Sequence, residues 1–238
     1  MHRYLLLIGL AALPFSSCDT LKNLPGANTG TYTAITEAEA AEGIRQALDQ
    51  GVNRGITFLN ARDGFFGNTA YKILMPPGAQ RIETTLRDLG MGSMVDRAIL
   101  QFNRAAEQAV VQARPIFVDA LRQMTIADAI NIVKGGRNAA TQYFRDKTTT
   151  ALTAAFTPII RSTLDQVNAT KYYDEVVGIY NGFPTTQQKI NPDLVSYVTG
   201  KAVDALFDQV AQEEANIRAN AAARTTDVLK RVFGYAAR

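Results

Sequence analysis

The chain has 238 residues, of which 47% are hydrophobic and 20% are charged, and its formal net charge is +3. This composition is that of a globular protein and excludes a disordered chain, a collagen-like repeat and a multi-span membrane protein. A chain of this length buries roughly 70% of its unfolded surface, so it needs neither a metal nor a disulfide for stability. The near-balance of 25 basic and 22 acidic residues, without a Lys/Arg cluster, argues against a nucleic-acid partner.

The N-terminal segment is typical of an export signal. Arg3 precedes an apolar run over residues 4–13, which is too short to span a bilayer. Small residues then lead to Cys18, the single cysteine of the chain, and this pattern resembles the lipobox that the bacterial lipoprotein machinery cleaves and acylates. We expect residues 1–17 to be a lipoprotein signal peptide, Cys18 to be lipidated and residues 18–35 to be a flexible tether; the alternative is a conventionally cleaved signal with a free thiol.

Removal of such a signal would restrict the chemistry of the mature chain. The single histidine, His2, would be lost and Cys18 would carry lipid. Ser-His-Asp and Cys-His nucleophilic systems are then excluded, as are zinc sites built on His or Cys. We therefore expect no metal, no cofactor and no catalytic residue, and a periplasm-facing protein that contacts the membrane through its anchor.

The first helix is predicted to begin after Thr36, because Thr36 and Glu39 have capping-box spacing. Gly51 and Gly55 are expected to weaken it. The following segment 62–68 has turn chemistry, with Phe65 and Phe66 expected to hold a loop in the core. Residues 71–75 form a run that is too short for a helix, so they make at most one isolated extended piece.

From residue 79 the apolar residues keep a helical period almost to the end of the chain. The pattern predicts helices near 82–89, 95–113, 116–124, 126–134, 138–167, 171–182, 193–217 and 226–236. Pro115 is expected to kink the helical segment or to begin a new helix, and Pro158 is expected to break or bend the 138–167 helix. Thr125 is expected to cap the 126–134 helix, and Asn191, followed by Pro, to cap the 193–217 helix. The fold class is all-α, a multi-helix bundle or array, with residues 36–238 as one domain.

Two groups of polar residues are candidate sites. Asp96, Asn103, Glu107 and Arg114 share one helical stripe on the flank of its apolar face, with Arg104 beside it. They predict either a polar pocket or, as we favour, hydrogen bonds that fix helix register. Asp63 and Asn68 could cap a helix or bind a ligand, although turn chemistry explains them.

Aromatic residues give a third candidate, since tyrosine is enriched at interfaces. Tyr172, Tyr173, Tyr180 and Phe183 form either a binding surface or, as we favour, part of the core. Near the C-terminus, Glu214 and Arg218 have the favourable i, i+4 spacing, and we expect them, with Glu213, on a solvated face.

Several blocks of the sequence together resemble a known bacterial family, domain of unknown function 4197. The resemblance runs in order through almost all of residues 36–236. Its blocks are Asp63-Gly64-Phe65 with Asn68 and Lys72-Ile73, residues 102–107, Asp128-Ala129, residues 139–144, Asp193-Leu194, residues 197–199, residues 204–207, Glu213-Glu214, Ile217-Arg218 and residues 223–234. The resemblance implies an exported, often lipid-anchored, helical protein, and it implies no activity.

The sequence therefore favours a lipid-anchored cell-envelope protein that acts as a non-catalytic binding or scaffold module. Two alternatives stay open. One is a hydrolase that works with two carboxylates and needs no histidine. The other is a carrier of an apolar envelope ligand in a cavity between helices, which helical bundles can form. A partner protein of the envelope is compatible with the first interpretation.

Overall fold

The computed structural model describes residues 36–182, 184, 186, 188–220, 223, 224, 227 and 230. The predicted signal peptide, Cys18, the tether and Phe183 lie outside these residues, as does almost all of the predicted last helix. The described chain is helical. Its α-helices and two short 3-10 helices (η) follow one another in the order α1 (Glu37–Asn60), η1 (Pro77–Ala79), α2 (Gln80–Asp88), α3 (Gly92–Ala109), η2 (Val110–Gln112), α4 (Ala113–Gln123), α5 (Ile126–Lys134), α6 (Ala139–Asp165), α7 (Ala169–Gly182) and α8 (Leu194–Ala219).

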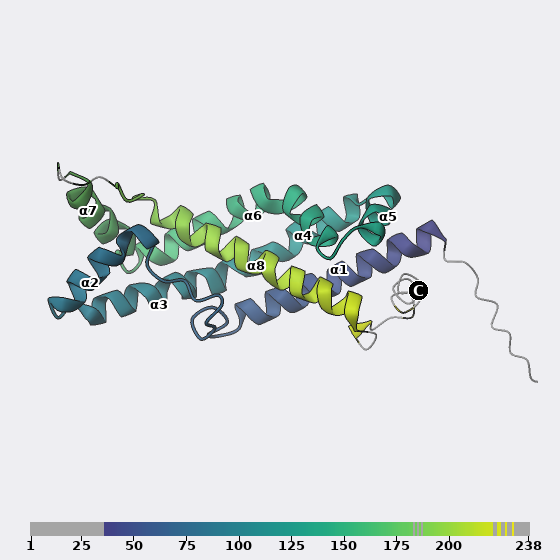
Figure 1. Ribbon diagram of the computed structural model, residues 1–238, viewed down its shortest axis with the longest axis horizontal. Coiled ribbons are helices and arrows are strands. Elements are labelled where there is room, and N and C mark those ends of the chain that lie inside the picture. The colour runs from purple at the N-terminus through teal and green to yellow at the C-terminus, as the bar shows by residue number, and fades with distance from the viewer. Residues whose placement is uncertain are drawn as a thin grey trace, which may run out of the picture. The chain divides into compact units, whose positions relative to one another are not determined.

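The all-α class is confirmed, and the described residues contain no strand: the segment 71–75, expected to be at most one isolated extended piece, is a turn and irregular backbone without β pairing. The long helix α8 packs against both α6 and α1, and α3 packs against α6 (Figure 1). In the part of the chain that the structure describes, no helix combines the length and apolarity needed to cross a membrane.

The core is built around large aromatic side chains. Phe117 of α4 contacts Phe144 of α6 edge to face, with ring centroids 4.8 Å apart, and Phe207 of α8 at 6.1 Å. These contacts join three helices that are far apart in the sequence. The fully buried phenylalanines are Phe65, Phe102, Phe117, Phe144, Phe156 and Phe207.

The predicted capping box at Thr36 is formed, and the predicted cap at Thr125 is a capping box as well. The Thr36 hydroxyl accepts from the Glu39 N–H at the start of α1, and the Thr125 hydroxyl accepts from the Asp128 N–H at the start of α5. The hydrogen bonds that Thr125 donates lower the pKa of Asp128. The cap of α8 differs from the prediction. Asp193, not Asn191, caps this helix by accepting from the Ser196 N–H at 2.9 Å.

The glycines of α1, which the sequence expects to weaken the helix, lie inside it, and the helix continues to Asn60. They lie at positions where α1 packs tightly against α8. A Cβ atom added at Gly55 would lie 3.1 Å from the Gln209 Cβ, and one at Gly51 would lie 3.3 Å from the Glu213 Cβ. Close packing of the two helices therefore outweighs the low helix propensity of glycine.

We expect Gly55→Leu to destabilise the protein by about 1–3 kcal/mol, because the larger side chain would push α1 away from α8. The matched control is Gly200→Ala on α8, where an added Cβ meets nothing within 4 Å. This control should stabilise the protein by about 0.5–1 kcal/mol through helix propensity. Urea unfolding followed by circular dichroism measures both, and a Gly55→Leu protein as stable as the parent would contradict the close packing.

Candidate functional site

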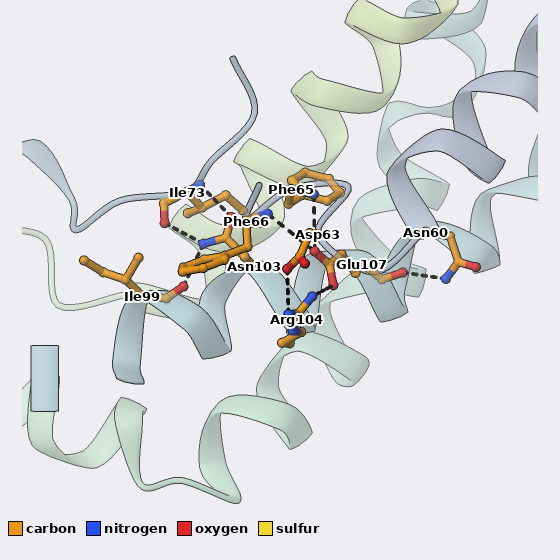
Figure 2. A network of polar contacts seen from close by, with 9 residues as sticks. All are labelled: Asn60, Asp63, Phe65, Phe66, Ile73, Ile99, Asn103, Arg104 and Glu107. Carbon is orange, nitrogen blue, oxygen red and sulfur yellow. Dashed lines mark hydrogen bonds and ion pairs between the residues drawn. The ribbon is translucent and has the colours of Figure 1, made fainter. Parts of the chain in front are cut away.

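A polar cluster joins the loop 61–76 to α3, and it contains four of the seven polar residues that the sequence singled out: Asp63, Asn103, Arg104 and Glu107 (Figure 2). Asn103 is fully buried and pairs with both backbone groups of Ile73. Its side-chain oxygen accepts from the Ile73 N–H at 2.8 Å, and its side-chain nitrogen donates to the Ile73 carbonyl at 2.9 Å and to the Ile99 carbonyl at 2.7 Å. The amide of Asn103 thereby uses both of its polar atoms to hold the loop.

Glu107 holds the preceding part of the loop. One carboxylate oxygen accepts from the backbone N–H groups of Phe65 and Phe66, at 3.2 and 3.4 Å, and the other accepts from Arg104 at 2.6 Å. Arg104 also pairs with Asp63 at 2.7 Å. The hydrogen bonds to Glu107 and Asp63 raise the pKa of Arg104. The carboxylate is therefore a structural acceptor whose charge is matched by a cation.

The local backbone explains why this loop needs such support. Asp63 has a positive φ of 67°, which is uncommon for a residue with a side chain. A Cβ atom at Gly64 would lie 2.5 Å from the carbonyl oxygens of Phe58 and Leu59, so glycine is required there. The loop turns tightly off the end of α1, and its contacts with α3 hold it in that turn.

The remaining polar candidates lie apart from this cluster. Asn68 makes a local turn by accepting from the Ala70 N–H at 2.9 Å. Asp96 is exposed and pairs with Arg87 at 2.8 Å. Arg114 is exposed on α4, beyond the short η2 turn that separates it from α3. The predicted stripe is thus interrupted, because η2 changes the helical register between Glu107 and Arg114.

A second buried carboxylate, Glu214, is found where the sequence predicted a solvated face. Its side chain is 5% exposed, and it pairs with Arg218 at 2.8 Å as its spacing suggested. The carboxylate also accepts from the backbone N–H groups of Ala140 and Thr141, at 3.1 and 2.9 Å, and from the Thr141 hydroxyl. Glu214 therefore caps the start of α6, where the N-cap residue Asn138 forms no side-chain cap.

The aromatic candidates divide between core and surface. Tyr173 is buried, and its hydroxyl donates to the Asn191 carbonyl at 3.2 Å. Burial raises the pKa of Tyr173 to about 12. Tyr172, the next residue, is 52% exposed, whereas Tyr180 is partly buried. These three tyrosines of α7 do not share one exposed face.

Several exposed apolar side chains lie instead at the end of α2, at the start of α3 and on α7: Leu89, Met91, Met94, Tyr172 and Ile179. Helices α2 and α7 lie at the same end of the domain (Figure 1). Helix α2 buries none of its residues. An apolar groove lies between α2 and α7, and we call it the α2/α7 groove; its apolar lining residues are Ile82, Leu86, Val176, Ile179 and Tyr180. Leu89 and Ile179 are 69% and 66% exposed. The sequence did not predict this surface, because the helical period places Ile82, Leu86 and Leu89 on one stripe without showing how much of that stripe is covered.

The fold and this cluster define an all-α domain whose described buried carboxylates support the structure. The chain belongs to the family described as "protein of unknown function (DUF4197)", whose model matches residues 34–234. This match confirms the resemblance found in the sequence. No curated protein and no solved structure gives a significant match to the chain.

Proposed function

We propose that this protein is a lipid-anchored protein of the cell envelope whose helical domain is a non-catalytic binding module. The observation that carries the binding role is the α2/α7 groove. A folded domain gains free energy by covering apolar side chains, at about 25 cal/mol per Å². Contiguous apolar surface that a domain leaves open is typical of an interaction site. The buried polar groups of Asn103, Glu107 and Glu214 serve the fold, so they support no competing site.

The anchor is supported by the sequence pattern that ends at Cys18. Two or three acyl chains on this residue would hold the domain at a membrane stably, which a single chain does not. A binding module at a membrane surface would meet lipids and other envelope components at high local concentration. The anchor and the groove therefore support the same role from two separate parts of the chain.

Labelling with an alkyne fatty acid tests the anchor. Bacteria that express the full chain should incorporate the label into this protein and retain it in the membrane fraction. The Cys18→Ala variant should lose the label, because the thiol that accepts the acyl chain is absent. An unlabelled parent protein, or a variant that keeps its label, would refute the anchor.

Photocrosslinking in the same cells tests the binding role. A photoreactive residue at position 179, in the α2/α7 groove, should form adducts. The same residue at position 150, which is exposed on α6, should form none. Mass spectrometry then identifies each adduct as lipid or peptide, and either kind supports a binding module. Equal yields at the two positions, or no adduct at either, would refute it.

A further inference from the structure

We propose that the α2/α7 groove and a cationic hollow beside it bind an anionic membrane lipid. The acidic headgroup would occupy the hollow, and an acyl chain would lie along the groove. This inference deepens the proposed function, on which it rests, by naming the class of ligand. Three observations support it: the hollow is lined by two basic side chains, its wall is hydrogen-bonded to α7, and it shares lining residues with the groove.

The hollow lies between the start of α2 and residues 186 and 188–190. Arg81 and Lys189 line it together with the side-chain amides of Gln80 and Gln188, and no acidic residue is among the described residues of its lining. Neither Arg81 nor Lys189 forms an ion pair or side-chain hydrogen bond within the described chain. By contrast, Arg87 and Arg104 each contact two carboxylates. An anion in the hollow would supply the charge that this lining lacks.

The wall of the hollow is held in place by α7. The side-chain oxygen of Asn181 accepts from the Ile190 N–H at 2.8 Å, and its side-chain nitrogen donates to the Ile190 carbonyl at 2.8 Å. This arrangement repeats the one between Asn103 and Ile73. The Thr186 hydroxyl also donates to the Tyr180 carbonyl at 2.7 Å. The segment that carries Lys189 is thus attached to the helix that forms one side of the groove.

The cationic hollow continues into the apolar groove. Arg81 and Tyr180 line both of them. On α2, Ile82, Leu86 and Leu89 are spaced by four and three residues, so they form one stripe that leads from the hollow to the exposed end of the helix. At 1.5 Å per residue this stripe is about 10 Å long. A ligand that fills both parts must be anionic at one end and apolar along the rest.

A membrane lipid fits this combination better than the other classes of ligand. A small soluble anion would pair with Arg81 and Lys189 but would leave the groove open to water. An apolar helix of a partner protein would cover the groove but would leave the cations unpaired. A lipid with an acidic headgroup covers apolar surface and pairs charge in one binding event.

Titration with soluble short-chain lipids tests the proposal. The protein is the full chain with Cys18→Ser, so that an acyl anchor cannot contribute to binding. The probes are dioctanoyl-phosphatidylglycerol, dioctanoyl-phosphatidylcholine and glycerol phosphate, each measured by calorimetry below its micelle concentration. We expect phosphatidylglycerol to bind at least about tenfold more tightly than the other two. Equal binding of the two lipids would refute the role of the cations, and equal binding of glycerol phosphate would refute the role of the groove.

Variants connect the binding to these residues. Arg81→Gln with Lys189→Gln should weaken phosphatidylglycerol binding by about tenfold or more. The matched control is Lys147→Gln with Lys171→Gln, which removes the same charge from exposed positions outside the hollow. The control should bind like the parent, and both double variants should keep the parental melting temperature. A control that loses as much affinity would refute the assignment of the site.

The two proposals can fail separately. If none of the three probes binds, the lipid inference is refuted. The crosslinking at position 179 then still decides the binding role. Peptide adducts at position 179 would support a binding module for a protein partner. The absence of any adduct at this position would refute the proposed function itself.

Discussion

Replacement of Glu214 by alanine should lower the free energy of unfolding by about 3–5 kcal/mol, because it removes a buried carboxylate that both pairs with Arg218 and caps α6. Arg218 would lose the carboxylate that it contacts at 2.8 Å. The N–H groups of Ala140 and Thr141 would lose their acceptor at the start of α6. The helix would then begin without a cap, since the side chain of Asn138 does not provide one.

The neighbouring residue is the matched control for this prediction. Glu213 pairs with Arg54 at 3.0 Å, and their side chains are 21% and 42% exposed. Because exposed ion pairs contribute little, Glu213→Ala should cost about 0–1 kcal/mol. The loss of stability in Glu214→Gln should lie between the losses of the two alanine variants, since an amide oxygen still accepts from the backbone but carries no full charge. Urea titration followed by far-ultraviolet circular dichroism measures all three, and equal losses for the two alanine variants would contradict the capping role.

Replacement of Asn103 by alanine should release the loop 61–76 from α3. The N–H and the carbonyl of Ile73 would lose their partners while Ile73 itself is 2% exposed. Each buried backbone group left without a hydrogen bond costs about 1–3 kcal/mol. We therefore expect a loss of stability by urea titration and, by hydrogen exchange, rapid exchange of the Ile73 amide, which the parent protein protects.

Asn68→Ala provides the control within the same loop. Asn68 accepts one hydrogen bond, from the Ala70 N–H, and lies partly exposed. Its removal should cost less than about 1 kcal/mol, because water can replace the lost bond. The Ile73 amide should stay protected in this variant. If Asn103→Ala left the protection of Ile73 unchanged, the bonds between Asn103 and the loop would not be what holds it.

The polar candidates show how far residue patterns predict a site. Asn103 and Glu107 were identified because polar residues on the flank of an apolar helix face must contact a neighbouring element. Their contacts with the loop agree with hydrogen bonding that fixes the structure, the alternative that we favoured. Their partners could not be predicted, because the loop folds back onto α3 through its own turn at Asp63 and Gly64. The spacing of residues along a helix predicts which side of the helix they share, but it does not identify the element that packs against that side.

Of the residues that line the proposed lipid site, the sequence singled out Tyr180 but neither Arg81 nor Lys189. Arg81, Tyr180 and Lys189 are separated by up to about a hundred positions in the chain. They come together because α2 and α7 line one groove and Asn181 holds the backbone of Ile190, next to Lys189. The periodicity of apolar residues does not predict that these three residues lie together, since this depends on how two helices from distant parts of the chain are placed.

The sequence by itself determined the helical class, the family and the two capping boxes, because these depend on contacts within a few residues and on the period of apolar side chains. The tertiary structure alone decided that Gly55 lies against α8, that Glu214 is buried and caps α6, and that the stripe of α2 is only partly covered beside Arg81. Each of these outcomes depends on which distant surfaces meet. Burial decides whether the same side chain is a solvated charge, a structural acceptor or part of a binding surface.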